Sequence, residues 1–196
     1  MKFLKYFIIF IFILNFQNNL FAKDPSALIN EIVDEAAAVL SSEDPIEAKI
    51  IKLNIIAESS VDIEGIGMYT LGKYRKTISE DEKSKYQKLF RSYFLKSFSS
   101  RLVDYTNPKI NVVSQKKINA KYTIVNSILE ATSKRPQVKI DWRIYTKNPD
   151  KPLIRDLIVE GLSLARTQKE EFNSIIQNND GDINALFKTL EEFIIK

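Results

Sequence analysis

The amino-acid sequence predicts an α+β domain in which helices precede and follow a four-stranded antiparallel sheet. Before residue 105 and again after residue 166, apolar residues recur every three or four positions, which is the period of an amphipathic helix. Between these regions the period falls to two, most clearly in VKIDWRIY (138–145). Only short turns separate the predicted strands. Because such turns leave no room for crossover helices, the sheet should be antiparallel.

Two helices are expected at the start of the domain. Asp24-Pro25 and Asp44-Pro45 each place a capping residue before a proline at the first helical position. Apolar stripes at helical spacing follow both pairs: Leu28, Ile32, Val33, Ala36 and Leu40 in the first helix, and Ile46, Ile50, Leu53 and Ile56 in the second. A short helix over VDIEGIGMYTL (61–71) should then end at Gly72.

The longest predicted helix runs from about Glu80 to about Asp104. Ser79 and Glu82 have the spacing of a capping box at its start. Its apolar stripe keeps the i, i+3, i+4, i+7 spacing of a helix with one buried face and is rich in aromatic residues. The stripe consists of Tyr86, Leu89, Phe90, Tyr93, Phe94, Ser97, Phe98, Leu102 and Tyr105.

The sheet and two further helices complete the predicted domain. The strands are expected over 109–115, 121–131, 137–145 and 153–161, separated by polar or proline-bearing turns. Thr167 with Glu170 is expected to cap the first C-terminal helix, and Asp182 the second. Gly161, at the end of the fourth strand, should permit a sharp turn.

The first 22 residues differ from the rest of the chain. Lys2 and Lys5 precede an apolar run from Phe7 to Leu14, and Ala22 follows a polar spacer. This is the order of a secretory signal peptide, with an uncleaved N-terminal anchor as the alternative. We therefore expect residues 23–196 to form a single exported domain, in the periplasm if the source is a bacterium.

The composition excludes several kinds of chemistry. The chain has no cysteine and no histidine, so disulfides, Ser-His-Asp or Cys-His catalysis and imidazole metal sites are impossible. No GxxxxGK[ST] nucleotide-binding loop occurs. Asp156 and Glu160 lie four apart on a predicted strand, where an exposed strand face explains them better than an acid/base pair. We expect no enzyme, cofactor or metal site.

Three short motifs stand out: Leu71-Gly72 with Tyr74, a run with Asp156, Val159, Glu160, Gly161, Ser163 and Leu164, and Phe172 nine residues after Ser163. Together they resemble the MlaC family of periplasmic phospholipid-binding proteins, which belong to the Mla lipid-transport pathway and are also called toluene-tolerance or ABC-transporter auxiliary proteins. The resemblance extends over nearly all of residues 23–196. Two departures are Pro152, where the family usually has tryptophan, and Lys169, where it tends to have arginine.

The resemblance implies a lipid carrier. Such proteins have a cone-like, curved sheet with helices over its concave face, and an apolar cavity between them. Phospholipid tails enter the cavity as cargo and the head group stays at the mouth. The implied partners are an outer-membrane lipoprotein–porin complex and an inner-membrane ABC complex, between which a monomeric carrier moves lipid to maintain outer-membrane lipid asymmetry.

Eight residues are the candidates for contact with lipid tails under this resemblance: Phe90, Tyr93, Phe94, Phe98, Ile140, Trp142, Ile144 and Ile158. The residues alone leave another interpretation open, because an aromatic stripe that faces a sheet is also typical of an ordinary core. A filled core would make the chain a periplasmic protein–protein adaptor without a ligand, since one fold can serve many functions. For Asp156 and Glu160 the sequence does not choose between contact with a partner and contact with a basic neighbour.

Overall fold

A computed structural model describes residues 23–105, 108–133 and 135–196, so the predicted signal peptide lies outside the described residues. The α+β class is confirmed. No helix in the described ranges is both long and apolar enough to cross a membrane. In chain order the elements are α2 (Pro25–Ser41), α3 (Ile46–Ser60), α4 (Ile63–Thr70), the 3-10 turn η1 (Tyr74–Lys76), α5 (Glu80–Leu102), β1 (Ile110–Asn119), β2 (Tyr122–Leu129), β3 (Val138–Tyr145), β4 (Leu153–Val159), β5 (Leu162–Ser163), α6 (Leu164–Gln177) and α7 (Ile183–Ile195).

The sheet is an antiparallel meander with the strand order β1-β2-β3-β4-β5. Four strands were expected, and the structure has a fifth, β5. The sequence did not predict it because two residues are too few to show an alternating pattern. It pairs with β4 through a turn in which Glu160 and Gly161 both have positive φ, 49° and 83°. The sharp turn predicted at Gly161 is therefore confirmed.

Two strands differ from the alternation seen in the sequence. β1 continues through Lys116 and Lys117, which pair with Ile124 and Thr123, because a strand at the sheet edge needs ladder hydrogen bonds but no buried face. In β4, Ile154 lies opposite Ile144 and Asp156 opposite Arg143, so Arg155 is an extra residue. Such a bulge reverses which side chains face inward.

The helix starts are only partly those expected. Asp24 caps α2, Ser79 with Glu82 forms the capping box of α5, and Asp182 caps α7, all as predicted. The cap predicted for α6 was wrong: the helix begins at Leu164, and the Ser163 side chain accepts from the backbone N–H of Arg166. The chain turns directly from β5 into this helix, which places Thr167 inside its first turn rather than before it.

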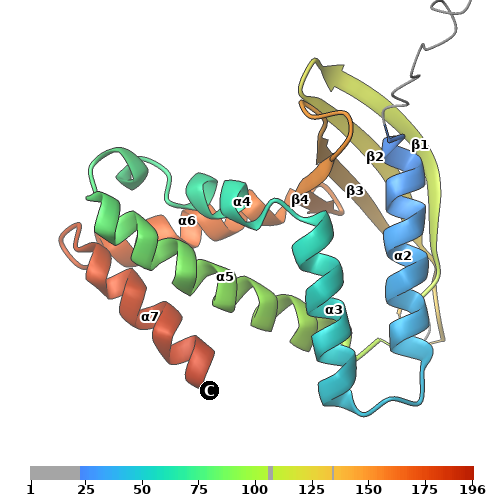
Figure 1. The fold of residues 1–196 in the computed structure, drawn as a ribbon, viewed down its shortest axis with the longest axis horizontal. Helices are drawn as coiled ribbons and strands as arrows, with labels where there is room; N and C mark the ends of the chain where they lie inside the picture. The colour runs from blue at the N-terminus through green and yellow to red at the C-terminus, as the bar shows by residue number, and fades with distance from the viewer. Residues whose placement is uncertain (1–22, 106–107, 134) are drawn as a thin grey trace, which may run out of the picture.

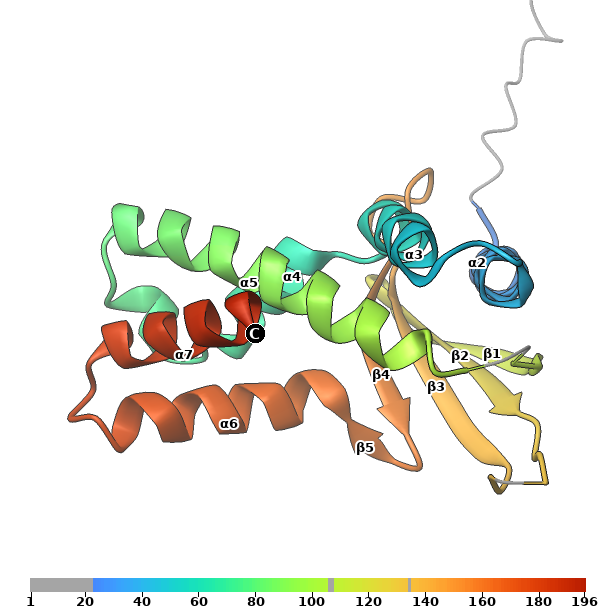
Figure 2. The same cartoon turned by 90° about the horizontal axis from the view of Figure 1, so that it is seen from below.

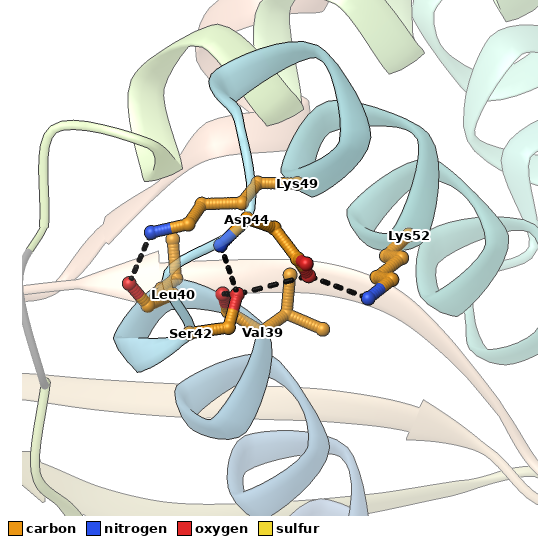
Figure 3. A network of polar contacts seen from close by, with 6 residues as sticks. All are labelled: Val39, Leu40, Ser42, Asp44, Lys49 and Lys52. Atoms are coloured by element: carbon orange, nitrogen blue, oxygen red, sulfur yellow. Dashed lines mark hydrogen bonds and ion pairs between the residues drawn. The ribbon is translucent and has the colours of Figure 1, made fainter.

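The cap predicted at Asp44 was also wrong, because its carboxylate is used elsewhere (Figure 3). Asp44 Oδ2 accepts from Ser42 Oγ at 3.0 Å and from Lys52 Nζ at 2.5 Å. Hydrogen bonds from Lys52 and Ser42 hold the pKa of Asp44 below its usual value. Lys49 Nζ donates to the Leu40 carbonyl at 2.9 Å, so this network closes the α2–α3 turn and satisfies the end of α2.

The helices form two groups around the sheet (Figures 1 and 2). α2 and α3 lie over one face of the sheet, while α4, α6 and α7 gather at its β4 side with the first part of α5. α5 runs from this group across to α3, where its last turns pack against Leu53 and Ile56. The buried apolar residues accordingly fall into three clusters, one inside the α4–α7 group, one between α2 and the sheet, and one between α2, α3 and the end of α5.

Candidate functional site

A cavity of about 500 Å³ lies where the three apolar clusters meet. Its lining includes Phe90 from the first cluster, Trp142 from the second and Leu40 from the third. Helices α2, α3 and α5, the start of α6 and strands β3 and β4 all contribute walls. The interior of the domain is therefore divided by a space rather than filled by one continuous core.

One wall is aromatic and comes from α5. Phe90, Tyr93, Phe94 and Phe98 all line the cavity, as their shared helical face predicts. The rings of Phe94 and Phe98 stack with centroids 6.0 Å apart and planes 7° apart, and Phe90 lies 6.2 Å from Phe94. Phe94 and Phe98 remain only half-buried, because part of each ring faces the empty space.

The sheet supplies the opposite wall. Ile140 and Trp142 of β3 line it, together with Ile154, Leu157 and Val159 of β4. The Trp142 indole N–H donates to Ser127 Oγ at 2.8 Å, and Ser127 Oγ donates to the Ile140 carbonyl at 3.0 Å. Since the indole N–H is satisfied within the sheet, Trp142 can present an apolar ring to the cavity.

Six of the eight candidate residues line the cavity, namely Phe90, Tyr93, Phe94, Phe98, Ile140 and Trp142. Ile144 does not; it is fully buried in the cluster between α2 and the sheet. Ile158 does not either, because the bulge at Arg155 turns Leu157 and Val159 inward and leaves Ile158 opposite Asp141 and Ser163. Contact of these residues with a lipid remains a prediction.

Sequence reasoning missed the contribution of the first two helices. Ile32, Val33, Ala36 and Leu40 of α2 and Ile56 of α3 line the cavity. All five belong to the apolar stripes read from the sequence, so the buried faces were found. Periodicity identifies a buried face but gives no sign of whether that face meets another side chain or an empty space.

Most of the residues on which the family resemblance rests stabilise the walls rather than line the cavity. Leu71 and Phe172 are buried in the cluster of the α4–α7 group, and Tyr74 packs against it. Gly72 has φ +58°, which glycine adopts most readily, and a Cβ there would lie 3.1 Å from Lys169 Cε. The Glu160 side chain accepts a hydrogen bond from the backbone N–H of Lys139 across the β3–β4 edge.

Asp156 is the buried charged residue of the cavity wall, and the exposed strand face expected for it was wrong. Its Oδ1 accepts from the Ala165 N–H at 3.0 Å, and its Oδ2 accepts from Ser163 Oγ at 2.7 Å. The Arg143 guanidinium lies 3.5 Å from Oδ2, so of the two alternatives left open by the sequence, a partner or a basic neighbour, the structure shows a basic neighbour. The carboxylate thereby joins β4 to the N-terminus of α6, where backbone N–H groups favour a negative charge.

The opening of the cavity is marked by the exposed members of its lining, which are Arg101, Leu164, Thr167 and Glu171. Beside them, Tyr93 Oη donates to Gln168 Oε1 at 2.7 Å, and Gln168 Nε2 donates to Glu171 Oε2 at 2.9 Å. Burial and the nearby Glu171 carboxylate raise the pKa of Tyr93, against a smaller opposite effect of Arg101. The mouth thus lies between the C-terminal half of α5 and the first turns of α6.

Comparison with known proteins agrees with this architecture. Residues 30–192 match the model of the family described as MlaC protein. A solved structure of the phospholipid-binding protein from Ralstonia solanacearum, in complex with a phospholipid, is similar with a TM-score of 0.75 and 18% identity over 88% of this chain and 97% of that one. At that identity the likeness shows a shared fold. No curated protein sequence matches. Because the family match extends over most of its length, this chain belongs to the MlaC family.

Proposed function

We propose that this protein is a periplasmic phospholipid carrier, and not an enzyme, which holds acyl chains in the cavity between α5 and the sheet. The observation that carries the proposal is the cavity itself, about 500 Å³ in volume with predominantly apolar walls. Sites for small molecules commonly have volumes of about 300–1,000 Å³. Membership of the MlaC family and the phospholipid in the related Ralstonia solanacearum structure both support this assignment.

The physics of burial determines how such a carrier works. Each buried methylene group gains roughly 0.8 kcal/mol relative to water, so two long acyl chains gain on the order of 20 kcal/mol. A membrane offers nearly the same gain, so exchange between protein and membrane is close to neutral while escape into water is very slow. The carrier therefore keeps its lipid until a partner offers a continuous apolar path.

Because exchange is close to neutral in free energy, the direction of phospholipid transport must be set by the partner complexes and not by this chain. We propose that it moves phospholipid between an outer-membrane lipoprotein–porin complex and an inner-membrane ABC complex, and so maintains lipid asymmetry. The sequence has no nucleotide-binding loop, so ATP hydrolysis is left to the inner-membrane partner. The alternative of a ligand-free adaptor requires a filled core, and the cavity weighs against it.

A substitution that fills the cavity tests the proposal. Ala36 lines the cavity from α2, whereas Ala38 is exposed on the same helix. Delipidated protein is incubated with vesicles that contain a fluorescent phospholipid, separated from them, and assayed for bound lipid. We expect near-stoichiometric loading of the unchanged protein and of Ala38→Trp, and much lower loading of Ala36→Trp with its circular dichroism spectrum retained. Equal loading of both variants, or no loading at all, would overturn the proposal.

A further inference from the structure

The charged residues that line the cavity differ in their pairing. Asp156 is buried and held by Arg143, Ser163 and the Ala165 N–H. Arg101 and Glu171 are exposed, and within the part of the chain that the structure describes neither forms an ion pair. The mouth therefore carries one positive and one negative side chain whose charges are available to a ligand.

The two charges lie on opposite sides of the mouth. Arg101 is on α5 and Glu171 is on α6, and both act on the phenol of Tyr93, one lowering and the other raising its pKa. Glu171 is oriented by the chain of hydrogen bonds that runs from Tyr93 through Gln168. The negative charge is thus held toward α6 by a hydrogen bond. Among the described residues, Arg101 on the facing helix has no carboxylate partner.

The position of a lipid head group follows from the cost of burying charge. A lipid whose acyl chains fill an apolar cavity cannot also bury its charged phosphate there unless a buried side chain pairs with that charge. The head group must therefore stay at the exposed part of the lining, which is where Arg101 and Glu171 lie.

We infer that the mouth recognises a zwitterionic head group, with Arg101 donating hydrogen bonds to the lipid phosphate and Glu171 facing the lipid ammonium. This inference rests on the proposed function and names the class of cargo. Guanidinium–phosphate contacts are among the stronger hydrogen bonds in proteins. A head group that carries a phosphate but no ammonium keeps the first contact and meets the negative charge of Glu171 without compensation, so the site discriminates by repulsion as well as attraction.

Competitive loading tests the inference. Delipidated protein is titrated with vesicles of equal phosphatidylethanolamine and phosphatidylglycerol content, and both lipids are quantified in the isolated protein by mass spectrometry. We expect the unchanged protein to be enriched in phosphatidylethanolamine, and Glu171→Gln to lower that enrichment about three- to fivefold, as for an exposed ion pair. Arg101→Gln should raise the vesicle concentration for half-maximal loading of both lipids, because both carry the phosphate.

Glu170→Gln and Arg75→Gln are the matched controls. Each removes the same charge from an exposed residue that does not line the cavity, and each should match the unchanged protein in enrichment and in half-maximal loading. If Glu171→Gln loads the two lipids in the same ratio as the unchanged protein, the head-group inference is overturned while the carrier function stands. If the unchanged protein takes up neither lipid, both fail together.

Discussion

Two phenylalanines distinguish the cavity wall from the core. Phe94 is half-buried and lines the cavity, whereas Phe172 is 2% exposed and packs against Tyr86, Phe90 and Tyr93. Truncation of Phe172 should create a new void and lower the free energy of unfolding by about 3–5 kcal/mol. Phe94→Ala enlarges an existing space, so we expect a loss of about 1 kcal/mol together with reduced or altered lipid loading.

Urea denaturation of delipidated protein measures the first quantity and vesicle loading the second. Phe172→Ala protein that remains folded should still take up lipid, because its ring is not part of the cavity lining. A loss of 3–5 kcal/mol for Phe94→Ala with unchanged loading would instead describe an ordinary core residue, as the adaptor alternative requires.

The buried Tyr86 should make the free energy of unfolding depend on pH in the alkaline range. Its ring is fully buried, and its hydroxyl lies 2.7 Å from Thr70 Oγ1. Burial raises the pKa of Tyr86 above that of a free tyrosine, so the native state keeps the phenol neutral while the unfolded state ionises near pH 10. This contribution to stability is complete below about pH 10 and is lost as the pH rises above it.

Tyr86→Phe should therefore flatten the decline of unfolding free energy above about pH 10, by up to ~1.4 kcal/mol per pH unit, at a cost of about 1 kcal/mol at neutral pH. Urea denaturation between about pH 8 and about pH 11 gives both numbers. Parallel curves for Tyr86→Phe and the unchanged protein would contradict a buried, neutral phenol.

At the scale of single residues, six of the eight residues named as candidates for lipid contact line the cavity. The two others do not line it, for identifiable reasons. Ile144 alternates correctly but meets α2 instead of the cavity, and Ile158 is displaced by one extra residue at Arg155. A bulge depends on how two strands pair, which alternation within one strand does not report.

The position of the aromatic wall depends on how α4 packs against α5. Gly67 is buried in α4, and a Cβ there would lie 2.8 Å from Phe90 Cδ1, closer than side chains normally approach. Gly67→Ala should push the two helices apart and lower the free energy of unfolding by about 1–3 kcal/mol. Because Phe90 lines the cavity, the same change should also alter lipid loading.

A double-mutant cycle identifies the cause. If contact with Phe90 is responsible, Gly67→Ala combined with Phe90→Leu should be less destabilised than the sum of the two single variants, since the smaller side chain relieves the overlap. Additive losses in urea denaturation would show that α4 tolerates the methyl group and that its glycine has another role.

At the scale of elements, existence was easier to predict than boundaries. The capping box at Ser79 and Glu82 predicted the observed start of α5, and the aromatic stripe predicted its end to within two residues. The start of α6 was missed because Ser163 belongs to β5 as well as to the helix cap, and a strand of two residues leaves no pattern. The predicted cap of α3 at Asp44 was wrong because the Asp44 carboxylate binds Ser42 and Lys52 instead, and these contacts cannot be read from the sequence.

The whole molecule owes its cavity to the spacing of its layers. Three separate apolar clusters hold α2 on the sheet, α3 on the end of α5, and α6 and α7 on α5, and the space lies between them. The periodicity of apolar residues in a helix or strand indicates which face is buried. The distance between two such faces depends instead on all the contacts that position the helices and the sheet. Sequence patterns therefore predicted the α+β fold, and the cavity was expected only through the family resemblance.

Native mass spectrometry of the protein purified from the periplasm of an expression host, followed by solvent extraction, tests the carrier function most directly. We predict adducts of phospholipid mass that extract as two-chain lipids. A clean protein mass, unchanged after incubation with phospholipid vesicles, would contradict the carrier function and favour a ligand-free adaptor.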